Sequence, residues 1–188
     1  MKISKGRGEN RSLYLRRAIA TFIDWYLASV LAGIPVLLIY NLENGDGNIA
    51  RSLESMSINY ALVAGTLAIL AASSYYLLLP TLWRNGQTLG KRFLGIKITN
   101  LDNGEVKFKD LFKREIIGVM LVEGGIICSS EYLRQMLTIV SNINTYKVLS
   151  ILASIITFIS IILIFITKEN RMIHDIISKT KVIEIKNA

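Results

Sequence analysis

The chain is 188 residues long, 52% of them hydrophobic and 19% charged, with a net charge of +8 and a mean hydropathy of +0.43. These values exclude an ordinary soluble domain, because a soluble chain of this length carries charge along its whole length. The single cysteine and single histidine exclude a disulfide framework and a cysteine- or histidine-rich metal site, so we expect no metal and no cofactor.

Four stretches are apolar and long enough to cross a bilayer, since about 20 apolar residues span about 30 Å of hydrocarbon. They are residues 17–40, 58–83, 115–133 and 148–167. The first follows basic residues, but it is too long for a signal peptide and contains Asp24, so we interpret it as an uncleaved span. The sequence therefore predicts one all-α membrane domain, residues 1–188, with four transmembrane helices.

The second predicted span carries small residues at regular intervals. Ala64, Ala68 and Ala72 follow one another four positions apart. Small side chains at this spacing let two helix backbones approach closely. We therefore expect this face of the second span to pack against a neighbouring helix.

Basic residues alternate between the segments that flank these spans. Six lysines and arginines lie in the N-terminal segment up to and including Arg17, eight lie in the central loop 84–114 and five in the tail 168–188, against one and two in the other loops. The positive-inside rule predicts that both termini and the central loop face the cytoplasm of a bacterial cell. The basic loop would then lie near anionic inner-leaflet lipids, and the positive charge gives no reason to expect nucleic-acid binding.

The central loop contains a pattern typical of a small hairpin. Apolar and polar residues alternate toward the end of the segment 93–99. Residues 102–104 (Asp-Asn-Gly) are a turn signal, and residues 106–108 would begin the second strand. This order predicts two short antiparallel strands between the second and third spans. Residues 86–91 do not form a phosphate-binding loop, because the glycine spacing is too short and Arg92 replaces the required serine or threonine.

Two acidic residues lie inside predicted spans, where ionisable groups are costly. At about 1.5 Å per residue, Asp24 lies about 10 Å into the first span and Glu123 about 12 Å into the third, which allows one shared interior site. One interpretation is a proton- or cation-binding group on a transport route; the other is an ion pair or hydrogen-bonded plug that holds helices together. For Asp24 both interpretations stay open. For Glu123 the structural interpretation is favoured, because Gly124 and Gly125 permit a kink at which water can reach the carboxylate.

The segment 171–178 after the fourth span has the pattern of a short amphipathic helix at the cytoplasmic interface. Asp175 within it is a candidate partner for Arg17 or Arg114. His174 titrates near neutral pH and could relay protons. A lone histidine at a membrane surface is more often an interfacial side chain, and we expect that role for His174.

Three segments together resemble the RDD family of bacterial membrane proteins. They are residues 17–24, 85–98 and 171–182. The resemblance assigns the family's naming residues to Arg17, Asp24 and Asp175, with Arg114 as a further arginine. It also covers the loop motif with Gly86, Gly90, Lys91 and Gly95.

The resemblance implies transport, and some family members have been linked to sodium–proton antiport. We therefore expect an ion-coupled transporter that uses Asp24 with Na⁺ or H⁺, as a homo-oligomer because four helices leave little room for alternating access. The alternative is a non-transporting assembly, scaffold or immunity protein whose buried charges only hold the fold. We expect no enzyme, because no nucleophile motif surrounds the only histidine.

Overall fold

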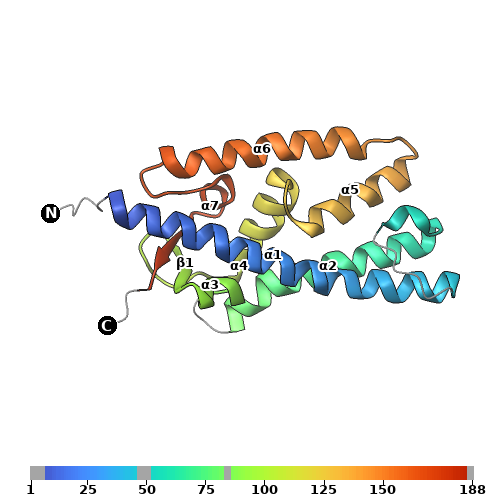
Figure 1. Cartoon of the computed structure of the whole chain (residues 1–188), viewed down its shortest axis with the longest axis horizontal. Helices are drawn as coiled ribbons and strands as arrows, with labels where there is room; N and C mark the ends of the chain where they lie inside the picture. Colours follow the sequence, from blue (N-terminus) through green and yellow to red (C-terminus); the bar gives the residue numbers. More distant parts are fainter. Residues whose placement is uncertain (1–6, 46–51, 83–85, 186–188) are drawn as a thin grey trace.

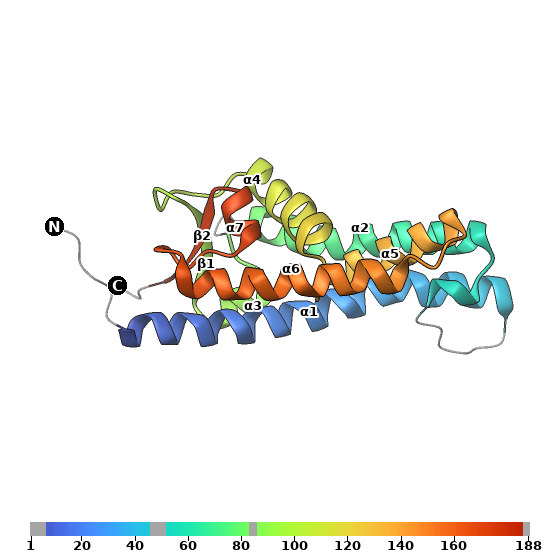
Figure 2. The same cartoon turned by 90° about the horizontal axis from the view of Figure 1, so that it is seen from above.

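The computed structural model describes residues 7–45, 52–82 and 86–185. Three helices are long and apolar enough to cross a membrane: α1 (Arg7–Asn44), α2 (Ile58–Leu82) and α6 (Tyr146–Ile166). All three run along the long axis of the molecule (Figures 1 and 2). The predicted spans 17–40, 58–83 and 148–167 fall within or beside these helices, although residue 83 lies outside the described residues. The same holds for Lys2, Lys5, Arg84, Asn85 and the end of the tail at 186–188.

The third predicted span is two helical pieces rather than one helix. Helix α4 (Phe108–Phe112) continues into the π-helix η2 (Lys113–Glu123), and α5 (Cys128–Ser141) follows after a break, bent by 54°. The span predicted at 115–133 is therefore not one continuous helix, because Gly124 adopts a left-handed conformation (φ +63°) that ends η2. This break begins at the glycines where the sequence permits a kink. The chain has three candidate spans, or four if the bent pair counts as one.

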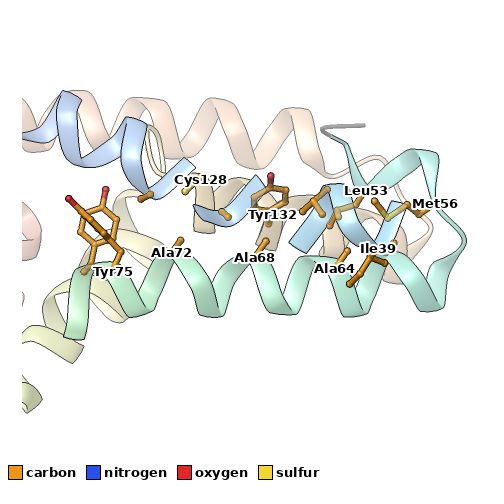
Figure 3. Close-up of a cluster of buried hydrophobic side chains, with 14 residues drawn as sticks. Ile39, Leu53, Met56, Ala64, Ala68, Ala72, Tyr75, Cys128 and Tyr132 are labelled. Carbon is orange, nitrogen blue, oxygen red and sulfur yellow. The ribbon is translucent and has the colours of Figure 1, made fainter. Parts of the chain in front are cut away.

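Small side chains form much of the core between α1 and α2. Ala28 and Ala32 on α1 and Ala64, Ala68 and Ala72 on α2 are fully buried. Figure 3 shows the α2 alanines in a row that faces this core. The prediction that small residues on the second span allow close helix packing is therefore confirmed. Tyr75, Cys128 and Tyr132 extend the same cluster.

The two strands of the protein come from distant parts of the chain. Strand β1 (Ile96–Asn100) pairs antiparallel with β2 (Thr180–Glu184), with Ile98 opposite Val182. The predicted hairpin with residues 106–108 is therefore wrong. The turn at 101–104 exists, with Asn103 at φ +64°, but the chain then enters α4 instead of a second strand.

Short helices complete one end of the bundle. Helices α3 (Leu89–Phe93) and α7 (Ile173–Ile177) lie with the strand pair near the start of α1, whereas the short helix η1 (Leu53–Ser55) belongs to the α1–α2 connection (Figure 1). The short helix predicted within 171–178 exists as α7, but His174 and Asp175 are buried in the protein rather than exposed on its surface. Gly118 on η2 permits this burial, since a Cβ there would lie 2.7 Å from the Cβ of His174.

Candidate functional site

Asp24 lies on the buried face of α1 and is fully engaged in hydrogen bonds. Its Oδ1 accepts from the Tyr75 hydroxyl at 2.6 Å and from the Gly90 amide at 2.8 Å. Its Oδ2 accepts from the Thr88 hydroxyl at 2.5 Å and from the Lys91 ammonium at 3.2 Å. Four donors from two elements and a loop hold this carboxylate in place, so the desolvation of its charge is compensated.

The glycine motif of the central loop brings these donors to α1. Gly86 and Gly95 both have positive φ (+63° and +65°), so the chain turns sharply on either side of α3. A Cβ on Gly90 would lie 2.5 Å from the Ala20 carbonyl oxygen and 2.9 Å from Asp24 Oδ1. Only glycine allows α3 to come this close to α1. The motif therefore builds a carboxylate-binding corner rather than a phosphate site.

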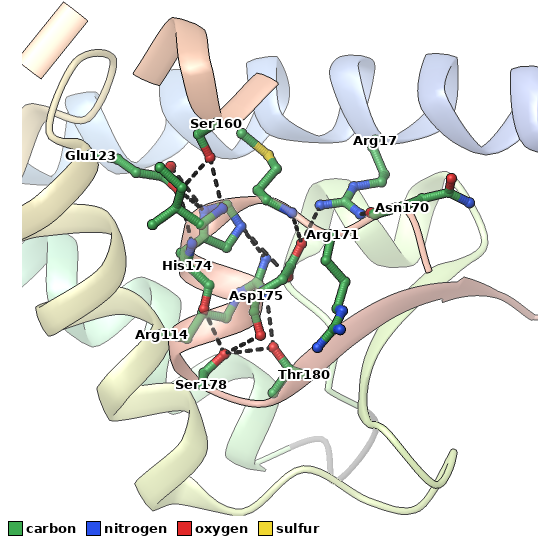
Figure 4. A network of polar contacts seen from close by, with 12 residues as sticks. Arg17, Arg114, Glu123, Ser160, Asn170, Arg171, His174, Asp175, Ser178 and Thr180 are labelled. Atoms are coloured by element: carbon green, nitrogen blue, oxygen red, sulfur yellow. Dashed lines mark hydrogen bonds and ion pairs between the residues drawn. The ribbon is translucent and has the colours of Figure 1, made fainter. Parts of the chain in front are cut away.

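Asp175 joins the C-terminal segment to two helices. Arg17 on α1 donates to its Oδ2 at 2.7 Å, and Arg114 on η2 donates to its Oδ1 (Figure 4). Arg17 also donates to the Asn170 carbonyl at 2.7 Å, and Arg114 to the Thr180 hydroxyl at 3.1 Å. The two pairings that the sequence left as alternatives both occur.

The carboxyl of Asp175 stays ionised in this environment. Burial raises its pKa, but the guanidinium groups of Arg114 and Arg17 outweigh burial and hold the pKa well below its usual value. The Met172 backbone amide adds a hydrogen bond of 3.0 Å to Oδ2. Asp175 is therefore a permanent negative charge between two permanent positive charges.

His174 connects Glu123 to Arg114. Its Nδ1 lies 2.9 Å from both carboxylate oxygens of Glu123, and its Nε2 lies 2.8 Å from Nη2 of Arg114. Because arginine only donates, Nε2 must accept, and the ring proton is on Nδ1, where it bonds to Glu123. In this tautomer the imidazole bridges Glu123 and Arg114. The expectation that it is an interfacial side chain is wrong.

Glu123 receives two further donors. The Ser160 hydroxyl on α6 donates to its Oε1 at 2.6 Å, and the His174 backbone amide donates at 2.9 Å. Glu123 thus joins η2, α6 and α7 at the break between η2 and α5. Asp24 and Glu123 accept from different side chains and do not form one shared pair, contrary to the simplest interpretation of their similar depth.

Both acids nevertheless face the same cavity of about 540 Å³. Arg17, Lys91, Arg114, Glu115 and His174 also line it. With Asp175, these eight side chains form what we call the buried charge array: Arg17, Asp24, Lys91, Arg114, Glu115, Glu123, His174 and Asp175. Its side chains come from α1, α3, η2 and α7.

The buried charge array does not balance. Among the described residues, the buried charged side chains are three cations (Arg17, Lys91, Arg114) and four carboxylates (Asp24, Glu115, Glu123, Asp175). With His174 neutral, one negative charge is in excess. An uncompensated charge in a low-dielectric interior is costly.

Sequence reasoning found six members of the array and placed Lys91 in the loop motif, but it missed that Lys91, Thr88 and Tyr75 bind Asp24. These partners lie 51 to 67 positions from Asp24, and no periodic pattern marks such a contact. Within the described part of the chain, no group of three or more His, Cys, Asp or Glu side chains is arranged to hold a metal ion.

Comparisons with known proteins match most of the chain. The model of the RDD family matches residues 11–179. The uncharacterized protein YckC of Bacillus subtilis (strain 168) is 30% identical over 164 residues, which cover 87% of this chain and 78% of that protein. No solved structure matches the chain significantly.

Proposed function

This chain belongs to the RDD family, and on that premise we propose that it exchanges a monovalent cation for a proton across the bacterial cell membrane. The observation that carries the proposal is the excess negative charge of the buried charge array beside a cavity. A proton and a cation can each neutralise this charge, but not both at once. Competition of two ions for one charge is the requirement for antiport.

Asp24 is the proposed exchange group. Its neighbours are the hydroxyl oxygens of Tyr75 and Thr88, and oxygen ligands suit hard cations such as Na⁺. An incoming cation competes with the Lys91 ammonium for Oδ2. Glu123 with His174 offers a second proton-accepting pair on the same cavity. Arg17, Arg114 and Asp175 hold the surrounding elements in place.

The orientation of this transporter follows from the basic loops. We expect both termini and the end of the bundle with β1, β2, α3 and α7 to face the cytoplasm, where the basic loop 86–114 contacts anionic lipids. We expect a homo-oligomer, because three complete helices and one broken pair leave little room for alternating access within one subunit. No enzymatic step is part of the proposal.

The test uses inside-out membrane vesicles with an imposed pH gradient. Addition of Na⁺, K⁺ or Li⁺ should collapse the gradient with wild type and fail to do so with Asp24→Asn, which removes the proposed exchange group. Asp102→Asn is the matched control, because Asp102 is an exposed acid outside the array. Absence of a response from folded wild type to all three cations, or wild-type exchange by Asp24→Asn, would contradict the proposal.

The second candidate is a non-transporting assembly, scaffold or immunity protein. It is favoured by one observation: Asp24, Glu115, Glu123 and Asp175 each already accept from a charged or polar side chain. In that case Asp24→Asn lowers the yield of folded protein, and ion flux into vesicles stays at the background level for wild type and Asp24→Asn alike.

A further inference from the structure

The cavity beside the buried charge array reaches the apolar outer surface of the molecule. Phe22 on α1 and Phe165 on α6 line it, although 66% and 65% of their surface is exposed on the outside of the molecule. Leu15 on α1 and Ile126 in the break after η2 combine the same two properties. The ring centroids of Tyr14 on α1 and Phe165 on α6 lie 5.0 Å apart. The exposed apolar side chains of the two helices place this edge of the cavity at the outer surface of the molecule.

The cavity is much larger than a proton or a bare metal ion needs. Its volume of about 540 Å³ lies in the range of pockets that hold drug-sized molecules. Its wall is apolar and partly aromatic, with Trp25, Phe22 and Phe165 among the lining residues. Phe22 and Trp25 stand together, with ring centroids 5.8 Å apart. The exchange of inorganic ions does not require this apolar part of the cavity.

We propose that this cavity is a binding site for an organic cation with an apolar body, such as a quaternary ammonium or phosphonium ion, that enters from the bilayer. The inference rests on the same excess negative charge as the proposed exchange, but it concerns binding at equilibrium and requires no transport. The positive centre lies near Asp24 and Glu123, and the apolar body lies against α1 and α6. Aromatic rings such as Trp25 attract cations through their π faces.

An organic anion fits the cavity less well. The guanidinium groups of Arg17 and Arg114 are bound to Asp175, and the Lys91 ammonium is bound to Asp24. An anion would have to break one of these buried pairs and would add to a charge that is already negative. The cavity should therefore discriminate between two ligands of the same shape and opposite charge.

The experiment measures binding of tetraphenylphosphonium to the purified full chain in detergent, with empty micelles as the blank. Tetraphenylborate is the control ligand, because it has the same shape and the opposite charge. We expect the phosphonium to bind at least about tenfold more tightly than the borate. Asp24→Asn should reduce this preference, because it removes one of the two carboxylates near which the positive centre lies.

A second variant blocks the cavity without touching the array. Ile161→Trp places a large ring in the cavity from α6, and Ile162→Trp places the same ring on the next residue of the helix. Their exposed fractions are 38% and 40%, and of these two side chains only that of Ile161 lines the cavity. We expect phosphonium binding to weaken about tenfold or more in Ile161→Trp and to stay unchanged in Ile162→Trp.

Equal binding of the two tetraphenyl ions, or equal effects of the two tryptophan variants, would overturn the inference. The outcome is independent of antiport. Phosphonium binding without cation-driven collapse of a pH gradient would refute the proposed exchange and support the organic-cation site. Collapse by Na⁺ without phosphonium binding would refute the site alone.

Discussion

Arg17 on α1 donates a hydrogen bond of 2.7 Å to Asp175 on α7, across 158 positions of the sequence. Both side chains are buried, and the other carboxylate oxygen of Asp175 is bound by Arg114. The contact ties the C-terminal segment to the first helix. A buried ion pair of this kind contributes little compared with an apolar pair, but removal of one partner leaves a buried charge alone and is strongly destabilising.

Asp175→Asn should therefore cost about 3–5 kcal/mol of unfolding free energy, because two buried guanidinium groups lose their carboxylate. Glu169→Gln is the control. Glu169 is 41% exposed and pairs with Arg171 and Lys181 at 3.8 and 3.7 Å, so its loss should cost about 0–1 kcal/mol. Unfolding in mixed detergent–SDS micelles measures both. Equal effects would mean that Asp175 does not stabilise the fold.

The stabilisation by Asp175 should depend on pH in one direction. Its pKa in the folded protein lies below the value of about 3.9 that an unfolded aspartate has. A group with a lowered pKa stabilises the fold above its unfolded pKa, and this contribution is lost as the pH falls toward the folded pKa. The difference in unfolding free energy between wild type and Asp175→Asn should stay constant from about pH 5 to about pH 8 and shrink below about pH 4. A difference that shrinks with rising pH in the neutral range would contradict this assignment.

The hydrophobic lengths of the spans were predictable, because they are local properties of the sequence. The alanine row on α2 was predictable for the same reason: residues four apart always share a helix face. The turn at 101–104 was also recognised, since its Asn and Gly determine the local backbone. The pairing of β1 with β2 was not predicted, because β2 lies about 80 positions after this turn and no local sequence pattern indicates which strand it pairs with.

The burial of the C-terminal motif was missed for a different reason. A five-residue helix with His174 and Asp175 beside isoleucines has the pattern of an interfacial helix. Its burial depends on Gly118, which lets η2 approach His174, and on arginines from two other elements. Compensation of a charge by distant side chains is a property of the tertiary structure.

Lys91→Met should destabilise the protein by about 3–5 kcal/mol, because Asp24 then lacks its buried countercharge. The double variant Lys91→Met with Asp24→Asn should be more stable than Lys91→Met alone, since no unpaired charge is left. Unfolding free energies of wild type, both single variants and the double variant complete the cycle. Additive effects would show that the two side chains do not interact in the folded protein.

Gly90→Ala tests the close approach of α3 to α1. The added Cβ would lie 2.5 Å from the Ala20 carbonyl oxygen and must displace α3, together with the hydrogen bond from its amide to Asp24. We expect a loss of about 1–3 kcal/mol. Gly33→Ala on α1 is the control, because nothing lies within 4 Å of its added Cβ and alanine favours the helix. A Gly90→Ala protein as stable as Gly33→Ala would mean that α3 does not pack against α1 as described.

Orientation can be measured with single cysteines, because Cys128 is the only native one and is buried. Starting from Cys128→Ala, Lys109→Cys places a thiol in the basic loop, and Asn144→Cys places one between α5 and α6; both positions are exposed. A membrane-impermeant maleimide should label Asn144→Cys in right-side-out vesicles and Lys109→Cys in inside-out vesicles, because basic loops stay in the cytoplasm. Labelling of both thiols from the same side would contradict an odd number of crossings between them. The reversed pattern would place the termini outside the cell, and the exchange of cations and protons would then have to be tested in vesicles of the opposite orientation.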